Sequence, residues 1–407
     1  MILPRYSVYA AFLAAAGIPI YIHAPKFFAD QYGVSLGAIG LALVGLRLLD
    51  VVQDPLLGRF AGRLQAGRRL AALVGSAGLC LGMFGLFVVT PPVPALWWMV
   101  LCLTVLFTAF SFLTILFYSR GVAQARVLGA RGHVRLAGWR EFGALTGVSI
   151  AAVAPYLVSR FTAWEPYVGF TILFIALAVT ASIAMHSAWP GPASNADTEW
   201  RGLLADPQIR RLLVVALFNA APVAVTSTLF LFFVEYRLAL PDLAGVFLLL
   251  FFVAAALSAP VWSMLSARFG ARSVLSAGMV LSVLSFIGAY GLTQGHAVAF
   301  GVVCLASGAA LGADMTLLPA IFAKRISDIG ENSGLAFGLW GFCSKFTLAL
   351  AAATVLPLLE ASGFRLGGVN DEAVLTRLSV LYALVPCGLK LVALAILVRR
   401  SPQRVIA

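Results

Sequence analysis

The sequence is poor in charged residues, which make up only 11% of its 407 positions. A soluble chain of ordinary composition carries about a quarter charged residues. Acids are the scarcer sign, with 16 Asp and Glu against 28 Lys and Arg, while hydrophobic residues make up 61%. This composition leaves too little polar surface to cover a water-soluble globule, so we expect most of the surface to face lipid.

The sequence also lacks the motifs of common enzymes. It contains no phosphate-binding G-x-x-x-x-G-K loop and no H-E-x-x-H zinc motif. Its five cysteines are an odd number, and they lie inside apolar runs without metal-like spacing. One G-x-S-x-G string, at 33–37, falls in a short turn and not at a strand-to-helix elbow. We therefore expect no enzyme, no cofactor and no metal site.

What the sequence does contain is a series of apolar runs, each about as long as a bilayer-spanning helix of about 20 residues. These runs lie at 6–28, 36–58, 70–90, 96–119, 136–158, 163–187, 210–233, 241–264, 272–292, 297–319, 332–358 and 377–398. They predict an all-α membrane protein with twelve transmembrane helices in two six-helix halves. The one long polar break predicts an N-terminal bundle (1–187), a cytoplasmic linker (188–209) and a C-terminal bundle (210–407).

The excess of basic residues follows this topology. With both termini in the cytoplasm, most of the 28 Lys and Arg lie in cytoplasmic loops, which is the positive-inside rule. We therefore predict a multi-pass protein of the plasma (inner) membrane. The net charge of +12 then needs no nucleic-acid partner.

The two halves resemble each other. Equivalent residues recur at a constant offset, namely Pro55 and Pro260, Arg63 and Arg268, and Arg140 and Lys345. Two six-helix halves with a duplicated basic loop are typical of the major facilitator fold. Two G-x-x-x-G spacings, at Gly78–Gly82 and Gly308–Gly312, predict close packing between membrane helices.

The second predicted helix carries the densest polar group, with Arg47, Asp50, Gln53 and Asp54. Arg47, Asp50 and Asp54 share one helix face, and the two acids are i,i+4 neighbours. Two carboxylates that close cannot both stay ionised in a dry site without a counter-charge. Arg47, a shared proton or a bound hard cation would supply it. A structural ion-pair network that locks this helix to its neighbours is the alternative.

Further charges interrupt the later helices. Arg140 and Glu141 lie in the fifth helix and Lys345 in the eleventh. Because Arg140 and Lys345 are equivalent in the two halves, we expect both to face a central cavity as counter-charges to the acids of the second helix. Asp314 is expected to pair with Lys345 or to line the cavity. Helix-end positions near the headgroups remain the alternative for Arg140 and Asp314.

Two further side chains lie beside prolines in the first helix. Tyr21 and His23 are flanked by Pro19 and Pro25. A kink there would bring both side chains toward a substrate in the cavity. A histidine satisfied locally within the apolar run is the alternative for His23.

The pattern of the second helix resembles a known signature. Arg47, Asp50, Asp54, Pro55 and Gly58, followed by a basic loop, are similar to the glycoside–pentoside–hexuronide:cation symporters, the melibiose permease family of the major facilitator superfamily. Weaker matches follow in order along the chain, at Trp139–Glu141, Asn219, Phe230–Glu235, Pro260–Trp262, Arg268–Gly270, Gly312–Asp314 and Lys345. The resemblance covers the second to the eleventh helix.

This resemblance implies roles for several residues. Asp50 and Asp54 would bind the coupling cation, with Gln53 beside them. Arg140 and Lys345 would be cavity charges. The sugar permeases carry further acids in their first and fourth helices; here the fourth helix offers only Ser111 and Thr114 as polar candidates for the cation site.

The resemblance also points to a cytoplasmic gate at the basic loops. We assign Gly58, Arg63, Arg68 and Arg268 to this gate. The usual Asp-Arg pair after the second helix is Gly62-Arg63 here, a change that is expected to alter the gate.

We therefore predict a secondary active transporter that couples Na+ or H+ to the symport of a sugar or another small organic solute by alternating access. Its partners would be the solute, the coupling cation and membrane lipid. A monomer is expected, because a twelve-helix bundle encloses its own cavity. The alternatives are a proton-coupled exporter or lipid transporter, and a membrane scaffold or sensor that does not transport.

Overall fold

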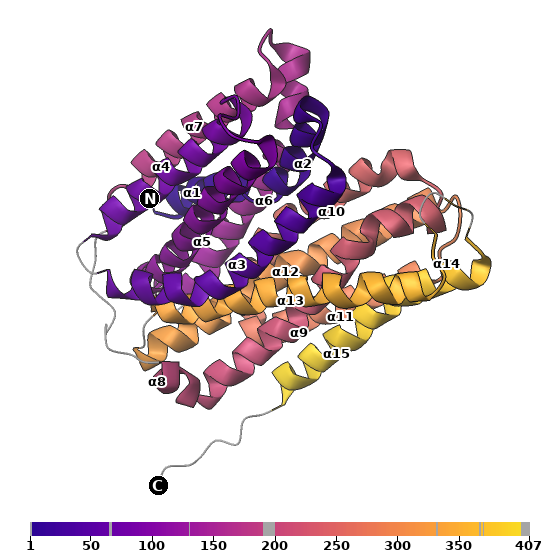
Figure 1. Ribbon diagram of the computed structural model, residues 1–407. Helices are drawn as coiled ribbons and strands as arrows, with labels where there is room; N and C mark the ends of the chain where they lie inside the picture. Colours follow the sequence, from indigo (N-terminus) through magenta and orange to yellow (C-terminus); the bar gives the residue numbers. More distant parts are fainter. Residues whose placement is uncertain are drawn as a thin grey trace. The chain divides into compact units, whose positions relative to one another are not determined.

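A computed structural model describes residues 2–64, 67–129, 131–189, 200–330, 333–365, 368 and 370–399. In these residues the chain is helical and contains no strand (Figure 1). The all-α class is therefore confirmed. The chain divides into two compact units, Met1–Thr198 with Ile326–Lys345, and Glu199–Arg325 with Phe346–Ala407. The predicted boundaries of the linker remain a prediction.

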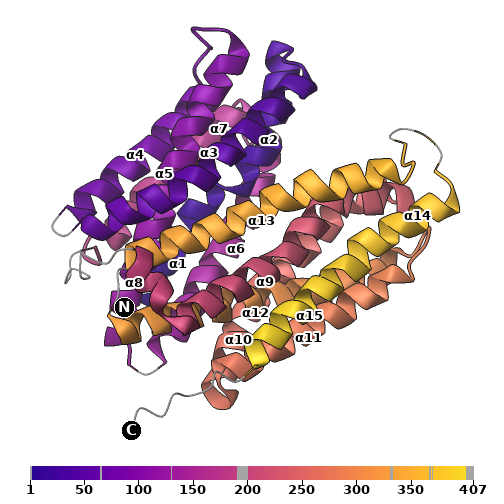
Figure 2. The same cartoon turned by 60° about the horizontal axis from the view of Figure 1, so that its bottom comes forward.

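The first unit is built from seven helices, the beginning of another and the last residues (Ile326–Ile329) of the helix Ala297–Ile329. These are α1 (Leu3–Ala15), α2 (Ile18–Tyr32), α3 (Leu36–Arg63), α4 (Arg68–Phe87), α5 (Ala95–Val127), α6 (Gly132–Phe161), α7 (Pro166–Met185) and the first part of α13 (Ser333–Ala361). Inside this unit α5 packs against both α3 and α4, and α1 packs against α6 (Figure 2).

The second unit holds the remaining helices and the last part of α13. They are α8 (Trp200–Ala205), α9 (Pro207–Phe232), α10 (Ala244–Phe269), α11 (Ala271–Tyr290), α12 (Ala297–Ile329), α14 (Glu372–Ser379) and α15 (Val385–Val398). Two π-helical turns, Phe233–Arg237 and Val380–Leu384, continue α9 and join α14 to α15.

Several helices begin at polar residues that cap them. The side chains of Ser35, Glu165 and Asp206 each accept a hydrogen bond from the backbone N–H three residues later. Such a cap satisfies one of the N–H groups that the first helical turn leaves without a partner. These residues therefore set where α3, α7 and α9 start.

Nine helices of the described chain are long and apolar enough to cross a membrane, or ten if the bent pair Gly132–Ala151 and Ala154–Phe161 is one span. The first two predicted runs are not among them. The first run is divided between α1 and α2, and the second run coincides with α3. Every predicted run nevertheless coincides with a helix or a broken helix, while the count of twelve stays a prediction.

Glycines allow the helices of each unit to approach closely. A Cβ at Gly143 of α6 would lie only 2.0 Å from the carbonyl oxygen of Ser7 in α1. The predicted close packing at the two G-x-x-x-G spacings is confirmed: a Cβ would lie 2.6 Å from Leu106 at Gly82, and 2.2 Å from the Phe251 carbonyl oxygen at Gly308. Backbone contacts of this kind hold membrane helices together where water provides no hydrophobic driving force.

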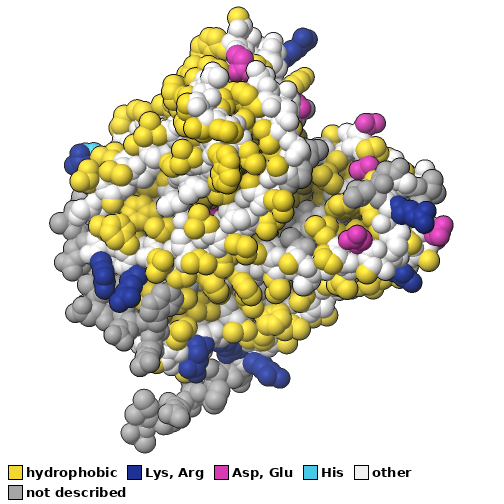
Figure 3. Space-filling view, in the orientation of Figure 1, with side chains coloured by type: hydrophobic (Ala, Val, Ile, Leu, Met, Phe, Trp, Pro, Cys, Tyr) yellow, Lys and Arg dark blue, Asp and Glu magenta, His cyan; other side chains and the backbone are white. Residues whose placement is uncertain are grey.

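The outer surface is strongly apolar. Figure 3 shows hydrophobic side chains across most of one face, with few charged groups among them. Leu41, for example, is 78% exposed and Met264 is 73% exposed. Apolar exposure on this scale is unfavourable in water and is expected for helices that face lipid.

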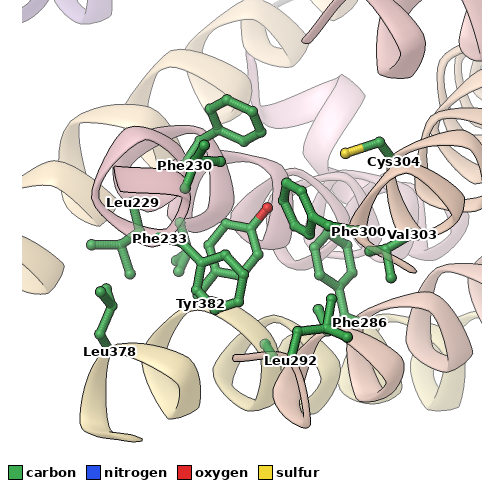
Figure 4. Close-up of a cluster of buried hydrophobic side chains, with 14 of the residues drawn as sticks. Leu229, Phe230, Phe233, Phe286, Leu292, Phe300, Val303, Cys304, Leu378 and Tyr382 are labelled. Atoms are coloured by element: carbon green, nitrogen blue, oxygen red, sulfur yellow. The ribbon is translucent and has the colours of Figure 1, made fainter. Parts of the chain in front are cut away.

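The second unit has an aromatic core at one end (Figure 4). We call Phe230, Phe233, Phe300 and Tyr382, with the buried aliphatic residues around them, the aromatic cluster. The rings of Phe233 and Tyr382 are nearly parallel, with centroids 4.2 Å apart, and Phe300 of α12 lies 5.5 Å from Phe233. Both stacked residues belong to the π-helical turns, so the cluster joins α9, α12 and the α14–α15 segment.

Candidate functional site

A stripe of polar side chains lies on the buried face of α3. Asp50 and Asp54 are each only 2% exposed, and Gln53 donates a hydrogen bond from Nε2 to Asp50 Oδ1 at 2.7 Å. Successive residues four apart fall on the same side of a helix, which is why both carboxylates point in one direction. The structure thus confirms that the two acids share a face. The side chain of Arg47 lies outside the described residues.

The counter-charge to both acids is Lys345 of α13. Its Nζ lies 2.9 Å from Asp54 Oδ1 and 3.3 Å from Asp50 Oδ1. The ammonium group therefore bridges the two carboxylates. Of the two cations expected in this role, the structure brings Lys345 to the acids, whereas Arg140 pairs elsewhere.

Helix α5 completes this group with two hydroxyls. Ser111 accepts a hydrogen bond from Lys345 Nζ and also bonds to Asp54, while Thr108 donates to Gln53 Oε1 at 3.0 Å. We call Asp50, Gln53, Asp54, Thr108, Ser111 and Lys345 the α3 cluster. Thr114, which the sequence offered as a candidate, has a buried hydroxyl that bonds to no described residue.

The chemistry of the α3 cluster suits a small cation. Carboxylate, amide and hydroxyl oxygens are the ligands that hard cations prefer, and here they converge on one ammonium group. Among the described side chains there are two carboxylates and one cation, so the cluster is one positive charge short when both acids are ionised. A proton or a monovalent cation would restore the balance.

Closely packed glycines hold α13 against α3 beside the cluster. A Cβ at Gly58 would lie 2.8 Å from the Gly334 carbonyl oxygen and 2.8 Å from Gly338 Cα. One at Gly341 would lie 2.6 Å from Asp54 Oδ2. We call this row of contacts the glycine strip. Because the two backbones touch, Lys345 can reach the acids, and any separation of the helices must stretch its ion pairs.

A second polar group lies between α5 and α6. Arg140 Nε donates to Glu141 Oε1 at 2.7 Å, and Tyr118 donates to the same oxygen at 3.1 Å. The Arg140 guanidinium carbon lies 3.7 Å from the centre of the Tyr118 ring, which is a cation–π arrangement. Arg140 and Glu141 are both buried, so Arg140 does not reach the headgroups as a helix-end residue would.

Several atoms of this second group are buried without a partner. Arg140 Nη2, Glu141 Oε2 and the Tyr6 hydroxyl make no hydrogen bond to any residue that the structure describes. Buried polar groups are normally satisfied, and each exception has a cost. The three atoms offer a donor, an acceptor and a hydroxyl whose hydrogen-bonding capacity is unused by the described residues.

Asp314 occupies a third buried group, in the second unit. It forms an ion pair with Lys390 of α15, which also donates to Asn219 Oδ1 of α9 at 2.7 Å. The expected partner, Lys345, belongs to the α3 cluster instead. Asp314 lies in the middle of α12 and is buried, so it is not a helix-end acid near the headgroups.

The other predicted site residues are placed as follows. His23 packs against the rings of Tyr167 and Phe170, each 6.0 Å away. The side chain of Tyr21 lies outside the described residues. Arg63 and Arg268 are exposed at the ends of α3 and α10, and Arg68 is buried at the start of α4. Their roles at a gate remain predictions.

Thr108, Tyr118 and the glycines of α13 were not predicted as site residues. Thr108 lies one turn from Ser111 on α5, and helical periodicity alone could have pointed to it. The spacing Gly334-x-x-x-Gly338 is also visible in the sequence. Nothing local marks Tyr118, because its role depends on the facing position of Arg140.

Comparison with known proteins agrees with this architecture. Residues 6–402 match the family described as MFS/sugar transport protein. The protein named "Putative glycoside/cation symporter YagG" of Escherichia coli (strain K12) is 22% identical over 401 residues, covering 88% of this chain and 83% of that protein. The resemblance to the cation symporters is thereby confirmed.

Solved structures show the same fold. A bacterial homologue of the iron transporter ferroportin, crystallised in an outward-facing state, superimposes with a TM-score of 0.76 at 12% identity and 98% coverage of both chains. The E. coli fucose:proton symporter superimposes with a TM-score of 0.69 at 15% identity, covering 98% of this chain and 99% of that one. Identities this low establish the fold alone. Together with the apolar helices, these matches show that the chain belongs to the MFS/sugar transport protein family and is a multi-pass membrane transporter, not an enzyme.

Proposed function

We propose that this transporter couples the movement of a monovalent cation, Na+ or H+, to the symport of a sugar or a similar small organic solute. The observation that carries the proposal is the α3 cluster, in which the Lys345 ammonium bridges Asp50 and Asp54. A tethered cation already occupies the place where a mobile cation would bind. The symporter name of the YagG relative supports the same reading.

In this mechanism the mobile cation competes with Lys345 for the two carboxylates. When the cation binds, Lys345 loses its ion pairs, and the contact between α13 and α3 depends on the glycine strip alone. A ligand shifts a conformational equilibrium only through its different affinity for the two states. Release of Lys345 provides such a difference, and it would bias the exchange between inward- and outward-facing states.

The solute would bind at the group formed by Tyr118, Arg140 and Glu141. The planar guanidinium of Arg140 and the carboxylate of Glu141 are complementary to adjacent hydroxyls of a sugar, and both have an unused polar atom. The Tyr118 ring, covered by the guanidinium, fixes its orientation. Glu141 and Arg140 neutralise each other, which suits a neutral solute.

The first experiment is thermal unfolding of the purified protein with sodium or with choline, at several pH values. A ligand that binds only the folded state stabilises it by about 2.7 kcal/mol at one hundred times its Kd. Sodium should raise the unfolding temperature of the wild type, and Asp50→Asn should abolish the rise. The matched control is Asp242→Asn, which changes an exposed acid in a turn and should leave the rise intact.

A proton-coupled protein would show no sodium effect but a pH dependence that Asp50→Asn removes. Uptake into proteoliposomes then tests transport directly, with a panel of radiolabelled sugars and an imposed sodium or pH gradient. Accumulation above equilibrium should require Asp50 and Asp54. If both Asn variants concentrate a sugar as well as the wild type does, the proposal is wrong.

A further inference from the structure

The second unit contains a buried polar group that the proposed function does not use. Lys390 is 1% exposed, and Asp314 and Asn219 are each 6% exposed. The Lys390 ammonium donates to Asn219 Oδ1 at 2.7 Å and forms an ion pair with Asp314. The three side chains come from three helices, α15, α9 and α12, so their meeting depends on the packing of the whole unit.

Stability does not explain why this group exists. A buried ion pair can often be replaced by apolar residues of similar volume without loss of stability, and sometimes with a gain. In a membrane helix each charge costs free energy to insert. A charged residue inside the membrane is therefore first taken to have a function. One turn before Lys390 on α15, the buried Cys387 belongs to the hydrophobic core of this unit.

The group also has an unused acceptor. Asp314 Oδ1 is buried and accepts no hydrogen bond from any residue in the described part of the chain. Along the chain, the aromatic cluster precedes Lys390 on α15 and Asp314 on α12, and follows Asn219 on α9. The unsatisfied oxygen therefore lies on a helix whose neighbouring core residues are uncharged.

Among the ion pairs of the described residues, no third charge joins Asp314 and Lys390. The nearest titratable residue along α15 is Cys387, one turn before Lys390, while Cys304 and Tyr382 belong to the core of the aromatic cluster. The other charged residues with described side chains in this unit lie at or near helix ends or between helices, namely Asp206, Arg210, Arg211, Glu235, Arg237, Asp242, Arg268, Arg272, Lys324, Arg325, Glu360, Arg365, Asp371, Glu372, Arg377 and Arg399. Within the described residues of this unit, the charge state of the group therefore depends on Asp314 and Lys390.

We propose that Asp314, Lys390 and Asn219 form a second ion-binding site, separate from the α3 cluster, that takes up and releases one proton. Among the described side chains, those that offer oxygens to Lys390 are Asp314 and Asn219, and a metal cation with several oxygen ligands needs more. Lys390 already fills the cationic position. A proton is the ion that this geometry accommodates.

The proton step is simple. One proton binds a carboxylate oxygen of Asp314, an O–H bond forms, and the ion pair to Lys390 is lost. The ammonium stays on Asn219 Oδ1, a neutral acceptor that serves it in both states. Release of the proton restores the ion pair. The step deepens the proposed function by adding a proton site, whether Na+ or H+ binds at the α3 cluster.

Infrared difference spectroscopy between acidic and alkaline pH tests this site without knowledge of the solute. A protonated carboxyl group in an apolar environment gives its own C=O stretching band. Asp50 and Asp54 would give a band of their own if the α3 cluster binds H+, so the contribution of Asp314 is the difference between the wild type and Asp314→Asn. We expect a component of the band that is present in the wild type and in the control Asp242→Asn and absent from Asp314→Asn. Identical bands in the wild type and Asp314→Asn, or no such band in the wild type, overturn the proposal and leave the pair as a structural lock.

A second variant keeps the test open if Asp314→Asn does not fold. The double variant Asp314→Leu with Lys390→Met removes both charges together and is expected to fold. It should lose the same component of the band as Asp314→Asn while keeping the sodium or pH response of the α3 cluster in thermal unfolding. If that response is absent from the wild type itself, the proposed function fails instead, and the two failures are distinguished.

Discussion

Replacing Gly58 with alanine tests how closely α3 and α13 must pack for Lys345 to reach its acids. The added Cβ would lie 2.8 Å from both the Gly334 carbonyl oxygen and Gly338 Cα. Carbon atoms normally approach to about 3.5–4.0 Å, so the helices would have to separate by about 1 Å. Overpacking of this kind costs about 1–3 kcal/mol.

The same helix offers a matched control. A Cβ at Gly45 would meet nothing within 4 Å, so Gly45→Ala carries the same change in helix propensity, about 0.5–1 kcal/mol in favour of alanine, without the clash. The free energy of unfolding in detergent, measured by denaturant titration, should be lower for Gly58→Ala than for Gly45→Ala by about 1–3 kcal/mol. Equal stabilities within about 0.5 kcal/mol would refute the reasoning.

Two further predictions concern ion pairs in each unit. Lys345→Met should destabilise the protein by about 3–5 kcal/mol. In a double-mutant cycle with Asp54→Leu, a coupling of about 0.5–3 kcal/mol is expected, and strictly additive losses would contradict it. The second prediction concerns Asp206, which caps the start of α9. Partial burial of this carboxylate opposes its ionisation, but hydrogen bonds from Arg325 and from the N–H of Ile209 outweigh the burial and hold the pKa of Asp206 below the usual value. Its contribution to stability is therefore present above about pH 4 and is lost as the pH falls through the lowered pKa. Thermal unfolding should show a smaller acid-induced loss in Asp206→Asn than in the wild type; an identical loss would contradict this.

The sequence predicts the local part of the α3 cluster but not its partner. Asp50 and Asp54 share a face because helical periodicity alone dictates it. Their partner Lys345 is 291 positions from Asp54, and several cations along the chain were equally plausible. Which one arrives depends on helix rotation and depth, quantities fixed by packing. For the same reason Asp314, expected to face Lys345, pairs with Lys390.

The glycine strip could not be predicted from the sequence because glycine is common in this chain. The chain has 38 glycines, so G-x-x-x-G spacings occur often and do not by themselves identify a partner helix. The spacings at Gly82 and Gly308 did predict close packing correctly. The contact of Gly58 with α13 could not be predicted from the sequence around either residue, because Gly58 and the glycines of α13 lie far apart along the chain.

The π-helical turn Val380–Leu384 determines which way the side chains of the last membrane segment point around the helix axis. A π turn holds one residue more than the α-helical turn it replaces, and each residue advances the helix by about 100°. The extra residue thus sets the angle between α14 and everything after it, including Lys390. Deleting one residue there would leave the composition and hydropathy of the segment almost unchanged. It would nevertheless rotate Lys390 away from Asp314 or Tyr382 away from Phe233, so length in this segment is constrained more tightly than residue identity.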